Sequence, residues 1–123
     1  MIGFEREIKK RGAGLQTYSL VGLGSAFFAI LTFRLLGQSA GAVDPTRLIQ
    51  AVATGIGFIG AGVVFRGEKH IEGLTTAAGL WVVSAIGIAV AMELYIEAVA
   101  STMLTLFVLV AFGFLERKVF DKG

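Results

Sequence analysis

LTLFVLVAFGFL, residues 104–115, decides the fold, because a helix formed by this stretch would be apolar on all sides. It belongs to the last of four stretches that contain no charged residue: Gly12–Phe33, Leu48–Phe65, Gly73–Met92 and Ala98–Leu115, of 22, 18, 20 and 18 residues. A helix needs about 20 apolar residues to cross a hydrocarbon core of roughly 30 Å. The sequence therefore predicts one all-α domain over residues 1–123, a polytopic bundle of four transmembrane helices. Their expected bounds are 12–33, 46–66, 73–92 and 97–116.

The composition excludes an ordinary soluble domain. Of the 123 residues, 16% are charged and 55% are hydrophobic, and the mean hydropathy is +0.80. A soluble domain of this size has to cover its surface with polar side chains, about a quarter of them charged. Cysteine is absent, which excludes disulfides and thiolate metal sites. The chain is interpreted as an integral membrane protein whose first partner is the lipid bilayer.

The placement of the basic residues predicts the orientation of the chain. Lysines and arginines lie at the ends of the apolar stretches rather than along one face, which argues against nucleic-acid binding. Nine of the 11 fall on one side of the four predicted helices, and only Arg34 and Arg47 fall on the other. Basic residues favour the cytoplasmic side. Both termini are therefore expected in the cytoplasm.

The first dozen residues are expected to form a short helical lead-in at the cytoplasmic surface. Glu5 with Lys9 and Glu7 with Arg11 are spaced as i,i+4 pairs of the favourable polarity. The two acids precede the two bases by one helical turn. The ion pairs are expected to support this helix.

Two further local signals fix the ends of the predicted helices. Asp44 followed by Pro45 predicts a helix that begins at about Pro45, because an aspartate caps free N–H groups and a proline at the first position needs no partner. Tyr18 and Tyr95 lie near the ends of apolar stretches, and both suit positions at the membrane–water interface.

The second predicted helix contains TGIGFIGAG, with four glycines: Gly55, Gly57, Gly60 and Gly62. The first three match the dinucleotide fingerprint G-x-G-x-x-G, but that motif requires a strand before it and a helix after it. Glycine weakens a helix by about 1 kcal/mol relative to alanine, so the run needs a compensating role. Small residues let helices pack closely, here with Ala53, Gly57 and Ala61 on one face of a helix surrounded by protein. Alternatively, a loosened helix exposes its carbonyls along a path for an ion or small solute.

The third predicted helix, which follows Gly73, is also rich in small residues and is expected to be closely packed. Thr75 and Thr76 either bond carbonyls of their own or a neighbouring helix, or form a polar patch that faces a partner or solute. Trp81 is too deep for an interfacial belt and is expected to fill space against the glycines of the second helix. The fourth helix is expected at the lipid-facing periphery.

No Asp, Glu, Lys, Arg or His lies inside the four stretches, which argues against a proton relay or an ion-coupled carrier. The sequence also lacks a phosphate-binding loop and a Ser/His/Asp set, so an enzyme is not expected. Glu93 and Glu97 would share a face if the fourth helix began early. They would then either ligate a cation or mark the water line.

Several segments resemble the MgtC/SapB family of bacterial membrane proteins. They are GFERE at 3–7, RGAGLQTYSLVGLGSA at 11–26, DPTRL at 44–48, TGIGFIGAGVVFR at 54–66 and GLTTAAGLWVVSAIG at 73–87. The resemblance implies a helical inner-membrane protein associated with magnesium homeostasis and with growth when magnesium is scarce. It also implies a role in virulence for some members, and the member that names the family restrains the ATP synthase.

The chain departs from the family pattern in several places. Members usually carry another apolar helix before the GFERE-like motif, so either this chain begins late or the protein natively has four spans. The soluble C-terminal domain of the namesake is also missing. Gln16 stands where many members have arginine, and Thr75 where some have asparagine.

Three functional hypotheses remain, and the third is a structural subunit of a larger assembly. The first is a non-enzymatic membrane protein without a cofactor that associates with other membrane proteins or with itself and influences magnesium homeostasis. The second is a transporter or channel component for a cation or small solute, with the glycine run as its conducting backbone; a metal site is left open. Arg47 and Arg66 flank the second helix and also suit anchoring it at the two water lines. The candidate family-motif and helix-packing residues are Glu5, Arg6, Arg11, Asp44, Arg47, Gly55, Gly57, Gly60, Gly62, Arg66, Gly73, Thr75, Thr76 and Trp81.

Overall fold

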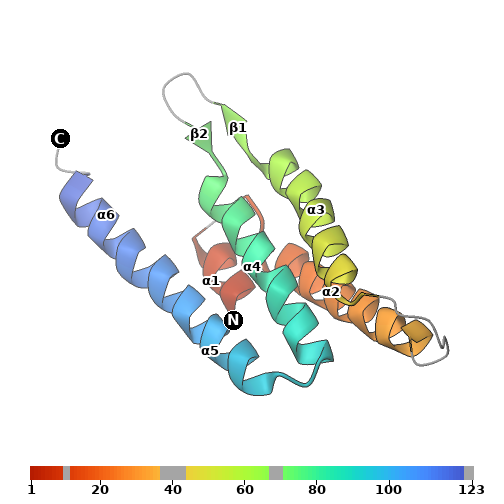
Figure 1. The fold of residues 1–123 in the computed structure, drawn as a ribbon. Coiled ribbons are helices and arrows are strands. Elements are labelled where there is room, and N and C mark those ends of the chain that lie inside the picture. Colours follow the sequence, from red (N-terminus) through yellow and green to blue (C-terminus); the bar gives the residue numbers. More distant parts are fainter. Residues whose placement is uncertain (10–11, 37–43, 67–70, 121–123) are drawn as a thin grey trace.

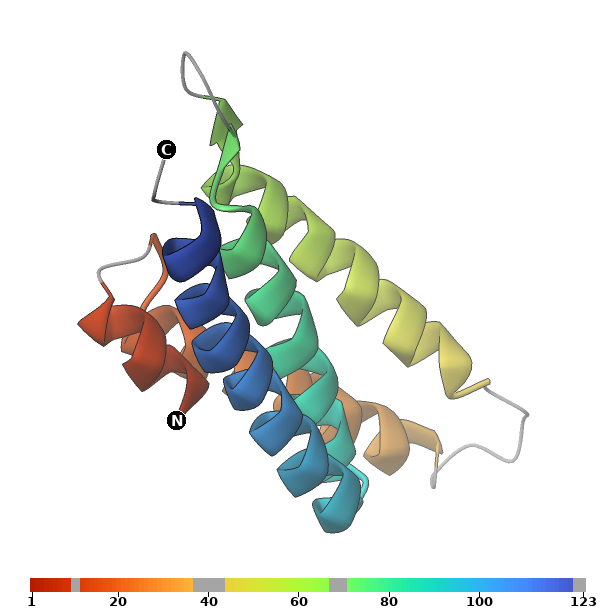
Figure 2. The same ribbon diagram turned by 90° about the vertical axis from the view of Figure 1, so that its left-hand side faces the viewer.

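The computed structural model describes residues 1–9, 12–36, 44–66 and 71–120, and it is built mainly of helices (Figure 1). In chain order the elements are α1 (Ile2–Ile8), α2 (Leu15–Leu36), α3 (Thr46–Val63), β1 (Phe65–Arg66), β2 (Ile71–Glu72), α4 (Leu74–Ala91), α5 (Tyr95–Phe107), the π-helical segment η1 (Val108–Phe112) and α6 (Gly113–Phe120). α5, η1 and α6 run on as one rod along an edge of the bundle (Figures 1 and 2). The predicted all-α fold is confirmed.

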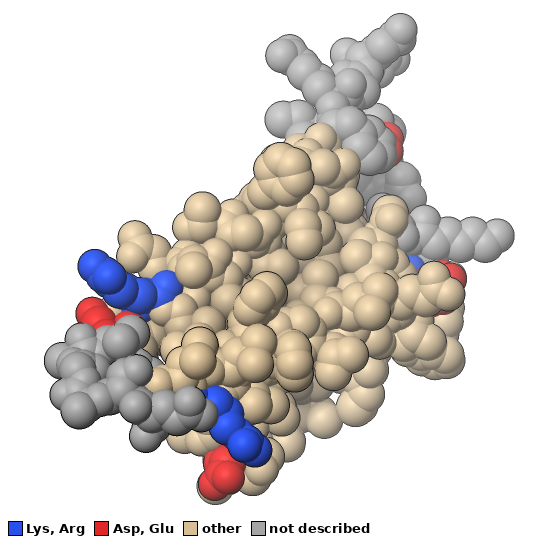
Figure 3. Space-filling view, turned by 90° about the vertical axis from the view of Figure 1, so that its right-hand side faces the viewer, with Lys and Arg blue, Asp and Glu red and all other residues tan. Residues whose placement is uncertain are grey.

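Four helical segments are long and apolar enough to cross a membrane: Leu15–Leu35, Thr46–Val63, Leu74–Ala91 and Tyr95–Glu116. Their ends differ from the predicted bounds by no more than about one helical turn. Large apolar side chains point outward along them, and Phe58 and Ile96 are 84% and 83% exposed. On the face seen in Figure 3, the charged side chains lie towards the edges and leave a broad uncharged surface between them. Such a surface matches the hydrocarbon layer of a bilayer.

α4 is the central helix of the bundle and packs against α2, α3 and α5 (Figure 2). Leu80 of α4 is fully buried and joins one apolar cluster with Ile2 and Ile56. A second cluster holds Ala29, Leu48 and Ile88. The expected close packing of the third span is confirmed, and the last span lies at the periphery, where most of its described side chains are exposed.

Glycines bring α2 and α4 into backbone contact, which is the common use of small residues between membrane helices. A Cβ atom at Gly87 would overlap the carbonyl oxygen of Gly22 and would lie 3.1 Å from the Cβ of Ser25. A Cβ atom at Gly22 would lie 3.3 Å from Cγ1 of Val83. The absence of side chains at these two glycines therefore sets how closely the two helices approach.

α3 is less buried than the sequence predicted. Within it only Leu48, Ile56 and Gly60 are buried, with Gly60 packed against Ala77 of α4. A Cβ atom added at any of the other glycines of the run would meet nothing within 4 Å: Gly55, Gly57 and Gly62. The prediction that protein surrounds this helix is wrong for the described residues, because α3 contacts its neighbours along one edge only. α3 is also an unbroken helix, so its carbonyls do not line a path.

Trp81 does not fill space against α3, and this prediction is also wrong. Its side chain is 56% exposed. The α3–α4 contact is closed by small residues, with the Cβ of Ala77 3.5 Å from the position of a Cβ on Gly60. The small side chains make the contact, and Trp81 remains largely exposed.

A short antiparallel ladder connects α3 to α4, with Phe65 paired to Glu72 and Arg66 paired to Ile71. Gly73 then begins α4 with φ of +85°, a backbone conformation that glycine adopts without strain. A Cβ atom at this position would also overlap the carbonyl oxygen of Val63. The hairpin therefore depends on glycine at position 73.

Candidate functional site: a buried charged cluster at α1

Helix α1 lies against one side of the bundle (Figure 2), with one face buried and Phe4 and Ile8 exposed on the other. Ile2 and Arg6 are each only 5% exposed. A Cβ atom at Gly3 would lie 2.9 Å from the Cβ of Tyr18 and 3.0 Å from the Cα of Leu15. Because Gly3 has no side chain, α1 can approach the start of α2 this closely. The predicted helix exists, and one of its faces is buried against α2 and α4.

Arg6 reaches from α1 to α4 and donates a hydrogen bond from Nη2 to the Thr76 hydroxyl oxygen over 2.8 Å. The Tyr18 hydroxyl, from α2, donates to the carbonyl oxygen of the same Thr76 over 3.1 Å. Thr76 and Tyr18 are 2% and 3% exposed, so Thr76 joins three helices inside the protein. Gly79 makes room for this arrangement, since a Cβ atom there would overlap the Tyr18 hydroxyl.

This geometry corrects two predictions about polar side chains. Tyr18 is not at the interface, because its hydroxyl finds a hydrogen-bond acceptor inside the bundle. The Thr76 hydroxyl accepts from a cation on another helix instead of only serving its own helix, whereas Thr75 is exposed.

Lys9 extends the cluster to the last span. The predicted ion pair between Lys9 and Glu5 is confirmed, and the Glu5 carboxylate is 11% exposed. Lys9 Nζ also donates to the carbonyl oxygen of Leu109, over 3.3 Å. Leu109 lies in η1, and π-helical turns often occur at functional positions in helices. α1 is thereby bound to α4 through Arg6 and to the last span through Lys9.

The cluster lies between the helices near one end of the spans, since Thr76 is the third residue of α4. Leu109 precedes Glu116, the last residue of its span, by seven residues, which corresponds to about 10 Å along a helix. The Lys9 ammonium group is therefore held well inside the end of that span. Ionisable groups at such depth are costly and commonly mark functional positions.

The charges of the cluster do not balance. Glu5 is one acid against two bases, Arg6 and Lys9, which leaves one net positive charge. Within the described part of the chain, Nε of Arg6 has no hydrogen-bond partner, and the Glu5 oxygens are held by ion pairs alone. A partly satisfied buried network is a poor source of stability. This favours a functional role for the cluster.

The four apolar stretches contain no Asp, Glu, Lys, Arg or His, but the fold brings charged side chains from outside them against the spans. Glu5, Arg6 and Lys9 precede the first stretch in sequence and are brought among the spans by the packing of α1. The other predicted pair, between Glu7 and Arg11, lies partly outside the described residues. Glu7 accepts a hydrogen bond from the backbone N–H of Leu15, over 2.9 Å.

Asp44 and Arg47 lie at the opposite end of the bundle, at the start of α3. Asp44 caps this helix as predicted, since its Oδ1 accepts from the backbone N–H of Thr46 over 2.9 Å. Hydrogen bonds from the side chain and the backbone of Thr46 lower the pKa of the Asp44 carboxyl below its usual value. α3 begins at Thr46, one residue after the predicted start.

The described residues provide no cation site at the α4–α5 turn. Glu93 lies before α5 with φ of +63°, and Glu97 lies in the first turn of α5, so the two do not share a helical face. No group of three histidine, aspartate or glutamate side chains that could hold a metal ion occurs among the described residues. For Arg66 the structure describes only the backbone, in β1, and Arg11 lies outside the described residues.

Four apolar spans with ionisable side chains buried between them define a multi-pass membrane protein. The chain belongs to the MgtC family, whose family model matches residues 1–118. The sequence resemblance to this family is thereby confirmed.

Three relatives illustrate the range of the family. The chain is 39% identical to the Escherichia coli K12 protein named "Putative magnesium transporter YhiD", over 99% of this chain and 59% of that protein. It is 39% identical to "Protein MgtC" of Brucella abortus, over 84% of this chain and 42% of that protein. It is 35% identical to "Protein SrpB" of Synechococcus elongatus, over 95% of this chain and 70% of that protein. The chain thus spans about half the length of the first two. No solved structure matches it.

Proposed function

We propose that the chain is a non-enzymatic membrane protein that supports adaptation to low magnesium by associating with another membrane protein or with a second copy of itself. Family membership and the printed names of its relatives, "Protein MgtC" and "Putative magnesium transporter YhiD", support the connection to magnesium. This support applies only to the part of each relative that the chain covers, 59% of YhiD and 42% of MgtC.

The open face of α3 is the observation that carries the proposed association. We define this face by Ala53, Gly57 and Ala61, which recur at i,i+4 spacing. Gly57 and Ala61 are exposed, Ala53 is half-buried, and a Cβ atom at Gly57 would meet nothing within 4 Å. Small residues at this spacing allow a second helix to approach closely in lipid. Within the described structure, no helix covers this face.

Filling the open face should abolish function without unfolding the protein. We expect Gly57→Leu to fail to support growth in low magnesium of a bacterial strain that lacks its own copy of the gene, since the leucine side chain blocks a second helix. The variant should reach the membrane in normal amount, because nothing in the chain clashes with the new side chain. Ala78→Leu on the exposed side of α4 is the matched control and should retain function. Full growth with Gly57→Leu would show that the open face of α3 is not needed for function.

A transport component is a second candidate, favoured by the buried Glu5, Arg6 and Lys9. Ionisable groups inside a membrane protein occur on ion pathways. Uptake of Mg²⁺ into liposomes that contain the purified protein distinguishes the two functions. Mg²⁺ flux that the Glu5→Gln substitution reduces would establish transport. If no cation tested crossed the liposome membrane, association would remain as the proposed function.

The distribution of lysine and arginine supports an inner-membrane orientation with both termini in the cytoplasm. A fluorescent protein fused after residue 123 should fold and fluoresce in intact cells. An alkaline phosphatase fused at the same place should be inactive, and activity there would reverse the orientation.

A further inference from the structure

A groove runs between α2 and α3 on the side of α3 away from its open face. Its volume is about 850 Å³, within the range of sites that hold a small ligand. The described side chains along its length are apolar or small, among them Val21, Gly24 and Phe28 from α2 and Val52, Gly55 and Ile56 from α3. A Cβ atom at Gly24 or Gly55 would meet nothing within 4 Å. Because these two glycines have no side chains, the space between the walls of the groove stays open.

The groove has the length of one leaflet of a bilayer. It extends along α3 from Arg47 to Ile59, and the twelve residue-to-residue steps between them correspond to about 18 Å of helix. Half of the hydrocarbon core is about 15 Å, whereas a transmembrane helix needs about 30 Å. The dimensions fit an acyl chain of one leaflet better than a helix of a partner protein.

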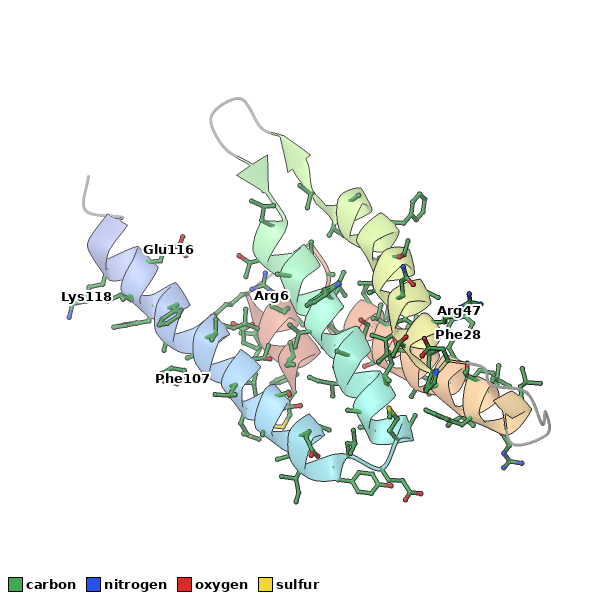
Figure 4. All side chains as sticks on the ribbon, viewed as in Figure 1. Arg6, Phe28, Arg47, Phe107, Glu116 and Lys118 are labelled. Atoms are coloured by element: carbon green, nitrogen blue, oxygen red, sulfur yellow. The ribbon has the colours of Figure 1, made fainter. Side chains whose placement is uncertain are left out.

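An acid and a base stand together at the mouth of the groove. Among its described lining residues, Asp44 and Arg47 alone are charged. The cap to Thr46 uses Oδ1 of Asp44, an exposed carboxylate. The Arg47 side chain has no hydrogen bond or ion pair with any described residue, and it lines the groove together with Phe28 of α2; both are labelled in Figure 4.

We propose that this groove binds one acyl chain of a phospholipid whose headgroup carries both a phosphate and a primary ammonium group. Arg47 binds the phosphate, because a guanidinium group pairs with phosphate oxygens through two parallel hydrogen bonds. Asp44 accepts a hydrogen bond from the ammonium group. The acyl chain lies between Gly24 and Gly55, in the leaflet at the N-terminal end of α3. This lipid site is separate from the open face proposed for protein association.

Native mass spectrometry of the purified chain tests the proposal. The protein is mixed with equal amounts of phosphatidylethanolamine, phosphatidylglycerol and phosphatidylcholine that carry identical acyl chains. We expect one retained phosphatidylethanolamine per chain, with the other two lipids bound several-fold less. Equal retention of all three would overturn the assignment of the headgroup.

Substitutions test separately the acyl-chain groove, the phosphate contact and the ammonium contact. Gly55→Leu and Gly24→Leu should each abolish the adduct with every lipid, whereas Ala78→Leu should leave it unchanged. Arg47→Ala should weaken all three lipids. Asp44→Asn, which keeps the capping oxygen, should remove the preference for phosphatidylethanolamine over phosphatidylcholine. Lipid binding in the groove would be contradicted if both glycine variants retained lipid as well as the original protein does. It would also be contradicted if the original protein formed a dimer that only these two variants lost.

Discussion

Replacing Arg6 with alanine should destabilise the protein by about 1.5–3 kcal/mol, the usual contribution of a hydrogen bond that involves a charged group. The change removes the hydrogen bond to Thr76 and leaves Glu5, which is 11% exposed, with Lys9 as its remaining ion-pair partner. The free energy of unfolding in detergent micelles, followed by the far-ultraviolet signal of the helices, measures the effect.

Two controls test whether the loss of stability comes from the contact between Arg6 and Thr76. Lys118→Ala removes a cation from an exposed position of α6 and should change the free energy of unfolding by less than about 0.5 kcal/mol. A double-mutant cycle of Arg6→Ala with Thr76→Val should give a coupling energy of about 1 kcal/mol or more, since the two side chains share a hydrogen bond. A coupling energy near zero would show that the α1–α4 contact does not exist in solution.

Replacing Gly87 with alanine should separate α2 from α4. The new Cβ atom would overlap the carbonyl oxygen of Gly22, and backbone cannot rotate away as a side chain can. Overpacking of this kind costs about 1–3 kcal/mol. The free energy of unfolding in the same micelles measures the loss.

Gly57→Ala is the matched control on α3. Its Cβ atom would meet nothing within 4 Å, and alanine favours a helix over glycine by about 1 kcal/mol in water. We expect this variant to be as stable as the original or slightly more so. If Gly87→Ala and Gly57→Ala had the same effect on stability, glycine packing would not explain how α2 meets α4.

The spans and their order could be predicted from the sequence because hydrocarbon imposes one strong condition, a long apolar segment with every backbone group satisfied. The cap at Asp44 and the ion pair between Glu5 and Lys9 are local in sequence, so spacing alone predicts them. The glycine turn at Gly73 lay in a recognised family segment, although its positive φ was not predicted.

The cluster at α1 could not be predicted, because its contacts join residues far apart in the chain. Arg6 and Thr76 are 70 residues apart, and Lys9 and Leu109 are 100 residues apart. The signal in the sequence was weak: Ile2 and Arg6 share a helical face with Gly3, but the charged residues around them suggest a surface helix. The exposure of Trp81 and of α3 was missed for a related reason, since small residues indicate close packing without showing which faces are covered.

The association of chains or partners through the open face of α3 is tested most directly by cysteine crosslinking in native membranes. The chain contains no cysteine, so a single cysteine introduced at position 57 reports on that face alone. We predict that Gly57→Cys forms a crosslinked species of defined mass under mild oxidation or with a short bifunctional thiol reagent. Val99→Cys, 59% exposed on α5, should remain uncrosslinked. Equal crosslinking at both positions, or none at position 57, would contradict the account.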